Sequence, residues 1–225
     1  MVEYEIRFPD GRVFQCTINR KRQRIQPPAD VPDWTRLDSH KCSACPLDSA
    51  KHEYCPVALD VQDVVKSFRD IPSAVTVEAV VKTSERWYFK KLPVEAALQS
   101  LLGLINATSL CPVLSSFNAL AQFHLPFASL EETFFRAVSY YLFKQYYRHR
   151  EGGTPDLDLK GLYELYEEIR TVNQDFLERI KAGADADATL HAVAKFISLS
   201  SSVGYSLEEF LKEFKKTVDR ERTSA

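Results

Sequence analysis

Residues 86–107 read RWYFKKLPVEAALQSLLGLINA, and the change of pattern that decides the fold lies within them. Up to Lys91 the stretch is rich in aromatic residues and is typical of a β-strand. From Val94 onwards, apolar residues recur at spacings of three and four, as they do along one face of a helix. Pro93 marks the boundary, because proline suits the first turn of a helix. We therefore expect strands before this proline and helices after it.

The N-terminal part predicts two β-hairpins. Residues 2–8 and 12–18 alternate between apolar and polar side chains, as in a strand with one buried face. Residues 9–11 (Pro-Asp-Gly) supply the turn between them. A second pair of strand-like stretches, 74–83 and 86–91, is joined by a two-residue link. We expect both hairpins to form one small antiparallel sheet.

The segment between the hairpins is expected to form a cysteine-rich metal loop over residues 26–60. Residues 26–56 contain five prolines and three cysteines, a composition too broken by proline for regular structure. A loop of this kind needs a clip to hold one conformation, and a bound metal would supply one.

Six stretches after Pro93 place apolar residues at helical spacing. They are residues 94–107, 113–123, 129–149, 157–181, 187–200 and 206–221. The sequences Ser129-Leu-Glu-Glu and Ser206-Leu-Glu-Glu are typical of capping boxes, which start helices. The chain is therefore expected to be an α+β protein, in which a small N-terminal antiparallel sheet with a cysteine-rich loop is followed by a mostly helical bundle.

The clearest break in the helical half is Gly152-Gly-Thr-Pro155. It separates a body of residues 1–150 from a C-terminal helical segment of residues 156–225. The loop is short and the helices on both sides are amphipathic, so the segment either stands apart or packs as part of the same domain.

The composition excludes several classes of protein. The chain has 225 residues, of which 45% are hydrophobic, so it can bury a core. No apolar run approaches the ~20 residues that cross a bilayer, and the N-terminus lacks the pattern of a secretory signal. We therefore expect a cytoplasmic protein without a membrane segment. The net charge of −2 and the isolated basic run at 20–24 do not favour nucleic-acid binding.

The strongest chemical signal is the set of five cysteines. In a cytoplasmic protein, cysteines are more often thiols or metal ligands than disulfides, and the odd number agrees with this. Cys42 and Cys45 have the two-residue spacing that lets two thiolates bind one metal centre. Cys55 and Cys111 complete a set of four ligands. Cys16 lies in a strand-like alternation and is better interpreted as a small core residue.

Three of these cysteines, Cys45, Cys55 and Cys111, precede a proline. Cys-Pro ends known iron–sulfur ligand runs, and proline stiffens the turn that presents the thiolate. The grouping resembles the iron–sulfur sites of oxygen-sensing transcription regulators of the fumarate-and-nitrate-reduction type and of some cluster-containing nucleases, although the gap before the third cysteine is longer here. We therefore expect an iron–sulfur cluster of the 4Fe–4S type.

Zinc is the alternative metal. His40, His52 and His124 lie near the cysteines in the sequence or in the motifs, and imidazole is a common zinc ligand. Four thiolates, or three thiolates and one imidazole, would suit a structural zinc ion. A third interpretation is that the cysteines are buried thiols without a metal.

A second candidate site lies at the turn before residues 129–149. His124 ends one expected helix, while Glu132 and Arg136 are four residues apart and share a helix face. Gathered over a pocket, the three side chains would bind an anionic or polar ligand, or serve a metal-dependent enzyme. The simpler interpretation is a capped helix with an ion pair.

The motifs Lys41-Cys-Ser-Ala-Cys-Pro-Leu47, Cys55-Pro56, Cys111-Pro112 and Phe123-His-Leu-Pro-Phe127 follow one another along the chain. In this respect the sequence resembles an uncharacterised bacterial protein family of unknown function with a Cys-x2-Cys-Pro…Cys-Pro…Cys-Pro pattern. The resemblance covers residues 1 to about 150 and implies no activity. It implies that the cysteine loop and the Phe-His-Leu-Pro-Phe corner belong to one site.

These patterns predict a cytoplasmic metal-binding protein with a redox-sensing, regulatory or partner-binding role. Its C-terminal helices are the expected contact with a protein partner. The alternatives are a structural zinc protein, a metal-dependent enzyme with its pocket at His124, Glu132 and Arg136, and an interaction module without a metal. The sequence contains no phosphate loop, dinucleotide fingerprint or nucleophile elbow, so it predicts no particular reaction.

Overall fold

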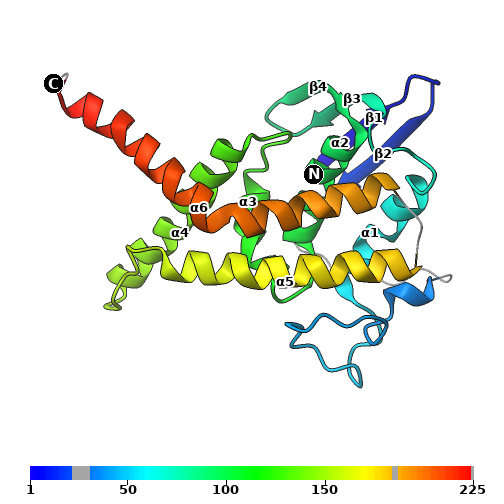
Figure 1. Ribbon diagram of the computed structural model, residues 1–225, viewed down its shortest axis with the longest axis horizontal. Coiled ribbons are helices and arrows are strands. Elements are labelled where there is room, and N and C mark those ends of the chain that lie inside the picture. Colours follow the sequence, from blue (N-terminus) through cyan, green and yellow to red (C-terminus); the bar gives the residue numbers. More distant parts are fainter. Residues whose placement is uncertain (22–30, 184–186, 224–225) are drawn as a thin grey trace.

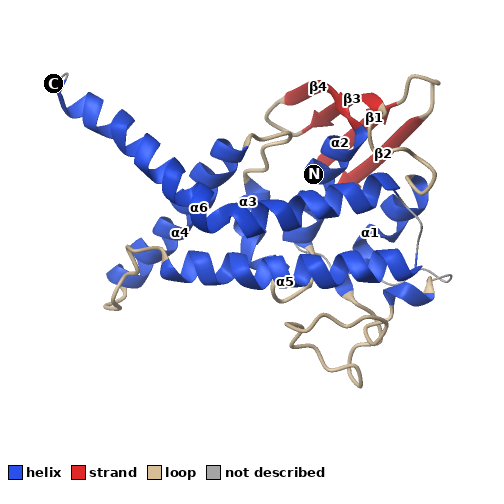
Figure 2. Cartoon of the chain, in the orientation of Figure 1, coloured by secondary structure: helices blue, strands red, loops and turns tan. Residues whose placement is uncertain are grey.

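The computed structural model describes residues 1–21, 31–183 and 187–223, except for the side chains of residues 195–205, 218 and 220–223. It confirms the α+β class, with the strands in the first part of the chain and most of the helices after them (Figure 1). The sheet lies at one edge of the molecule, the helices lie beside it, and a long stretch of loop projects below α5 in this view (Figure 2).

Both expected hairpins are present, and they join in one antiparallel sheet with the order β2-β1-β3-β4. The strands are β1 (Val2–Arg7), β2 (Val13–Ile18), β3 (Thr76–Lys82) and β4 (Trp87–Pro93). Tyr4 in the central strand β1 is paired with Cys16 on one side and with Val81 on the other. Gly11 has a φ of 88°, which explains why glycine follows Pro9-Asp10 in the first hairpin.

The helices follow the change of pattern at Pro93, which caps the first long helix of the second half. They are α1 (Pro56–Ser67), α2 (Val94–Thr108), α3 (Asn118–Gln122), α4 (Leu130–Arg150), α5 (Lys160–Gly183) and α6 (Asp187–Thr223), with short 3-10 helices η1 (Asp33–Thr35) and η2 (Leu114–Phe117). None of the described helices has both the length and the apolar character needed to cross a bilayer.

Helix α1 differs from the sequence-based expectation. The cysteine-rich loop is predicted over residues 26–60, but the helix already begins at Pro56. Pro56 stands in its first turn, so the Cys55-Pro56 pair also starts a helix. In the described part of the loop before Cys55, regular structure is limited to η1 and the bridge between Arg36 and Tyr54. Residues 26–30 of the expected loop lie outside the described residues.

Two other helix boundaries differ from the expectation. The stretch 113–123 is divided into η2 and α3 instead of forming one helix. The stretches 187–200 and 206–221 are one continuous helix, α6. Ser206 therefore does not start a helix: no proline breaks the chain before it, and the single Gly204 weakens a helix without ending it.

One face of the sheet is buried against helices. Val2, Tyr4 and Ile6 of β1 point to this face, whereas Glu3 and Arg7 point away from it. Helix α2 packs on β3 and β4, and the ring of Phe68 after α1 packs at 4.8 Å from the ring of Phe14 in β2. This alternation makes the sheet one wall of the core.

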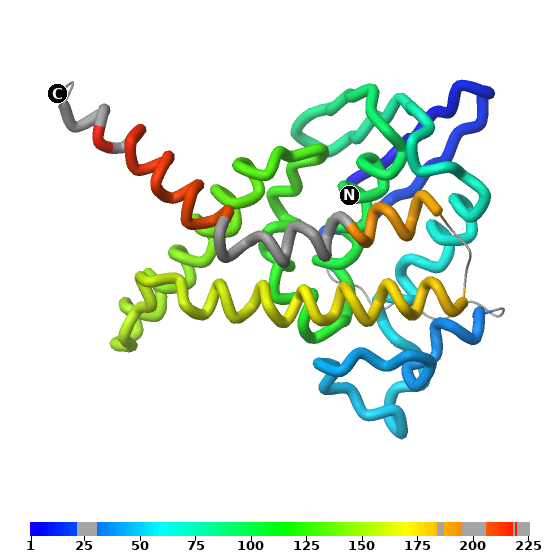
Figure 3. Tube along the Cα trace, in the orientation of Figure 1, coloured from blue at the N-terminus to red at the C-terminus, as the bar shows by residue number. Residues whose placement is uncertain are grey.

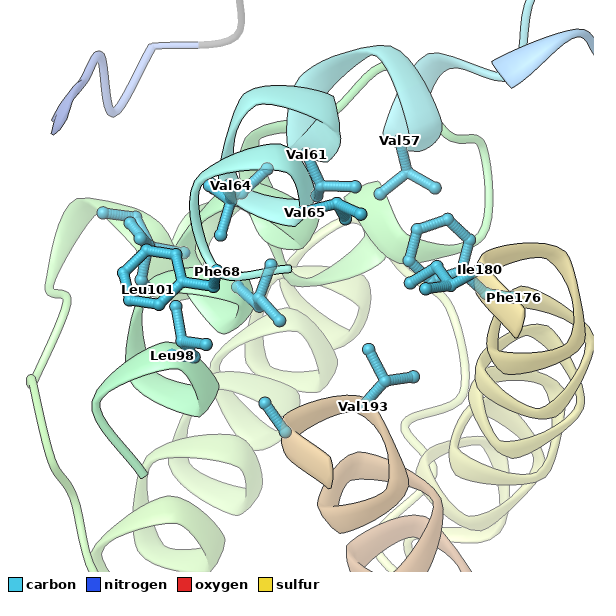
Figure 4. Packing of buried hydrophobic residues seen from close by; sticks show 14 of the residues in the cluster. Val57, Val61, Val64, Val65, Phe68, Leu98, Leu101, Phe176, Ile180 and Val193 are labelled. Atoms are coloured by element: carbon cyan, nitrogen blue, oxygen red, sulfur yellow. The ribbon is translucent and has the colours of Figure 1, made fainter. Parts of the chain in front are cut away.

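Helices α5 and α6 lie side by side and close the core from the other side (Figure 1). Phe176 and Ile180 of α5 and Val193 of α6 face the valines of α1 and the leucines of α2 (Figure 4). The segments 1–150 and 156–225 thus contribute to one hydrophobic core. The C-terminal part of α6 extends beyond the rest of the molecule (Figure 3).

Candidate functional site

The cysteine loop is closed by backbone hydrogen bonds at its ends. The amide of Cys55 donates to the carbonyl of Thr35 at 2.8 Å, and the amide of Leu37 donates to that of Glu53 at 2.9 Å. These bonds place Cys55 beside η1 and leave the residues between as a closed loop.

Cys55 occupies the N-cap position of α1 and is buried. Burial raises the pKa of its thiol, while the Arg179 guanidinium and the backbone amides of Ala58 and Val57 act in the opposite direction. The first turn of α1 thus offers hydrogen bonds that favour a thiolate.

Cys42 and Cys45 lie at the two ends of one tight turn. The amide of Cys45 donates to the carbonyl of Cys42 at 3.0 Å. Cys42 is buried against α5, where its Sγ is 4.0 Å from the carbonyl oxygen of Val172. Asp175 of the same helix accepts hydrogen bonds from the amide and the hydroxyl of Ser43 at 2.7 and 2.8 Å. The turn is therefore fixed to α5.

Cys111 comes from a different part of the chain, the turn after α2, where its amide donates to Ser109 Oγ at 3.3 Å. Burial, the most important cause, raises the pKa of Cys42 to about 12, and the nearby Cys55 and Cys111 thiols raise it further. Cys111 also acts on Cys55. Three of the four expected ligands thus lie within electrostatic reach of one another, although long stretches of sequence separate them.

Arg179 of α5 is fully buried next to this cysteine group. Its guanidinium donates to four backbone carbonyls, those of Trp34, Arg36, Leu37 and His40. Among the described residues its Nε has no hydrogen-bond partner, and no carboxylate forms an ion pair with it. Its positive charge acts to lower the pKa of both Cys42 and Cys55, against the larger effect of burial, and so favours their thiolate forms.

The thiols are not arranged as a finished metal site. In the described residues, no group of three or more His, Cys, Asp or Glu side chains is placed to hold a metal ion. His40 and His52 are exposed. Cys45 is half-buried beside Cys42, and Cys16 lies in β2.

His124 lies in a second polar group, at the inner face of the sheet. Its Nε2 is 2.6 Å from the hydroxyl of Tyr4, which is 2.8 Å from Ser100 Oγ. Ser100 also accepts a hydrogen bond from the amide of Phe127 at 3.1 Å. Burial, with the nearby Arg136 and Arg20, lowers the pKa of His124 to about 3, so the imidazole is neutral at pH 7.

Arg136 lies near His124, whereas Glu132 caps the start of α4. Arg136 Nη2 donates to the carbonyls of Leu120 and Phe123, both at 2.9 Å. Glu132 forms the expected capping box with Ser129. His124 and Arg136 line a common cavity, whereas Glu132 is not among its lining residues.

The sequence reasoning missed Arg179, Tyr4 and Ser100. Arg179 carried a signal, because the apolar stripe of α5 runs through Val172 and Phe176 to this position. A charged residue on such a stripe needs buried partners. Tyr4 and Ser100 follow ordinary strand and helix patterns, and nothing in the sequence marks them.

The fold and these groups define an α+β protein with a buried cysteine group between the loop and α5, and a polar corner around His124. Residues 2–219 match the family model described as Domain of unknown function (DUF6901), so the chain belongs to this family. This confirms the expectation of an uncharacterised family. No curated protein and no solved structure matches the chain.

Proposed function

We propose that this chain is a metal-binding protein in which Cys42, Cys45, Cys55 and Cys111 hold an iron–sulfur cluster, with zinc as the alternative metal. The observation that carries the proposal is the fully buried Arg179 beside the cysteine thiols, which has no carboxylate partner in the described residues.

A buried charge is costly unless an opposite charge or a full set of hydrogen bonds compensates for it. Four carbonyls solvate Arg179 but do not neutralise it. Deprotonated thiols of Cys42 and Cys55 would supply the missing negative charge. Metal binding would deprotonate them, because thiolates and not thiols are ligands.

Other residues around the thiols would position the cysteines and stabilise negative charge on their sulfur atoms. The turn through Ser43 holds Cys42 and Cys45 together, and Asp175 fixes that turn to α5. The first amides of α1 would donate to the Cys55 sulfur, and such hydrogen bonds tune the potential of a cluster. The bound cluster itself would supply one-electron redox chemistry.

A redox-sensing or regulatory role would follow from the way the loop is held. In the described residues, the loop is closed by backbone hydrogen bonds and is held to α5 by Arg179, by Asp175 and by the burial of Trp34 and Cys42. Four metal–thiolate bonds would add a clip that joins the loop to the turn after α2. Loss of the cluster would release this clip and change the surface offered to a partner.

The test is metal analysis of protein purified without oxygen. We expect iron, acid-labile sulfide and the broad absorption band at about 400 nm that is typical of protein iron–sulfur clusters. Replacing Cys45 or Cys55 by serine should remove most of the bound metal. Cys16→Ser is the matched control and should retain it, because Cys16 lies in the sheet.

Each other outcome has a clear meaning. Colourless protein with one zinc per chain that is lost in the same cysteine variants would establish the alternative metal. Protein without any metal, or with metal that is unaffected by Cys45→Ser and Cys55→Ser, would contradict the proposal.

A further inference from the structure

We propose that two adjacent cavities around His124 and Arg136 bind a small amphipathic carboxylate, with its apolar body between α2 and α5 and its acid group at Arg136. This inference is independent of the metal and concerns a different part of the molecule.

The first cavity has a volume of about 230 Å³ and lies among α2, α3, α4 and α5. Most of its described lining residues are apolar, among them Ala96, Leu104, Phe117 and Ile169. An apolar cavity of about 150 Å³ is already large enough to take up benzene. The space therefore suits an apolar group of several carbon atoms.

The second cavity, of about 470 Å³, is strongly cationic. Arg20, Arg86 and Arg136 line it, and Glu85 is the one acidic residue among its described lining residues. Glu85 is already paired with Arg20 at 2.9 Å. Two guanidinium groups thus remain without a carboxylate in this lining, which favours an anionic ligand.

The two cavities are adjacent, because they share three lining residues, His124, Leu125 and Arg136. A ligand that occupies both would pass from an apolar space to a cationic one at this point. Such a division of polarity fits a molecule with an apolar body and one negatively charged end.

Arg136 is the group that would bind the acid. It is half-buried, and in the described residues it forms no ion pair; only its Nη2 donates hydrogen bonds there, to two carbonyls. Burial lowers the pKa of Arg136, which reflects the cost of a cation that is poorly hydrated. A carboxylate on the other edge of the guanidinium would offset this cost and fit its planar geometry.

The other polar groups at the junction do not compete for Arg136. The Tyr4 hydroxyl is engaged with His124 and Ser100, and burial raises the pKa of Tyr4, so it stays neutral. His124 is neutral as well. Tyr4 and His124 therefore add hydrogen-bonding groups but no negative charge near Arg136, and the one acidic residue of the described lining, Glu85, is paired with Arg20.

Isothermal titration with sodium octanoate and with 1-octanol tests the inference, because the two probes share the same apolar body. We expect octanoate to bind one site per chain, at least about tenfold more tightly than octanol, since a charge-assisted hydrogen bond contributes about this factor. Arg136→Gln should remove this preference. Ala96→Leu, which fills the first cavity, should weaken both ligands.

Arg148→Gln is the matched control, because it removes one exposed arginine from the same helix outside both cavities. It should bind octanoate like the unchanged protein. If Arg136→Gln does not fold, as judged by circular dichroism, Arg86→Gln replaces it and should reduce the preference for octanoate by about threefold. Absence of octanoate binding, equal affinity for octanol, or an unchanged preference for octanoate in Arg136→Gln, or in Arg86→Gln where it replaces that variant, would overturn the inference.

Discussion

The Arg179 side chain connects α5 with the cysteine loop, and its burial makes it the most sensitive single residue of this region. It donates to the carbonyls of residues that precede it by 139 to 145 positions. Removing it would take this partner from the buried carbonyls of Trp34 and Leu37, and each such loss costs about 1–3 kcal/mol.

We predict that Arg179→Met lowers the free energy of unfolding by about 3–5 kcal/mol, as is usual when one partner of a buried charge network is removed. Urea denaturation followed by circular dichroism measures this. Arg170→Gln on the same helix, whose partner Glu167 is largely exposed, should cost less than ~1 kcal/mol. Equal effects of both substitutions would show that Arg179 has no special structural role.

His124 predicts a pH dependence of stability. Its pKa is about 3 in the folded protein, below the usual 6.5 of an imidazole. Below pH 6.5 the unfolded chain therefore binds a proton that the folded chain does not, so stability is complete above this pH and falls as the solution becomes more acidic.

Between pH 7 and pH 5, we expect the free energy of unfolding to fall by about 1 kcal/mol more in the unchanged protein than in His124→Gln. The effect is limited to this size because the side chain is only half-buried. Urea denaturation midpoints at the two pH values give this difference. Parallel pH profiles of the two proteins would show that His124 does not titrate in this way.

At the scale of elements, Asp175 joins α5 to the turn that carries Cys42 and Cys45. It accepts two hydrogen bonds from Ser43. We predict that Asp175→Ala makes the loop open more often, so that a thiol reagent labels Cys42 about tenfold faster in the metal-free protein.

Mass spectrometry of the labelled peptide provides the rate for Cys42. Gln174→Ala, an exposed neighbour on the same helix, should leave that rate unchanged. A labelling rate that is the same in Asp175→Ala as in the unchanged protein would mean that the loop is held by other contacts.

The end of α5 and the 3-10 helix η1 approach each other too closely for a side chain at Gly183. A Cβ atom there would overlap the Cβ of Trp34. We predict that Gly183→Ala destabilises the protein by about 1–3 kcal/mol, which a lowered thermal midpoint would report. An unchanged midpoint would mean that η1 moves aside without cost.

The sequence predicted most elements because their signals are local. Alternation gave β1 to β4, and spacings of three and four gave α2, α4 and α5. Helix α1 was missed because Cys55-Pro56 was interpreted only as a ligand motif, although proline also starts helices. The break expected before Ser206 was wrong because a capping sequence caps only where the backbone leaves the helix.

At the scale of the whole molecule, the sites depend on contacts that no local pattern encodes. Tyr4 and His124 are 120 residues apart, and Cys42 reaches the carbonyl of Val172 from 130 residues away. The spacing of the cysteines predicts a common group; in the structure Cys42, Cys55 and Cys111 act on one another electrostatically, but the described residues do not form a metal-binding group. The partners of that group, above all Arg179, emerge only when α5 folds across the loop.

The most direct test of the cysteine site is X-ray absorption at the iron or zinc edge of the protein purified without oxygen. We expect a first shell of sulfur alone and a second shell of iron, because each iron of such a cluster would be bound by one cysteine thiolate and by bridging sulfides. A shell of nitrogen and oxygen, or an identical spectrum in Cys55→Ser, would contradict the assignment of the metal to these four cysteines.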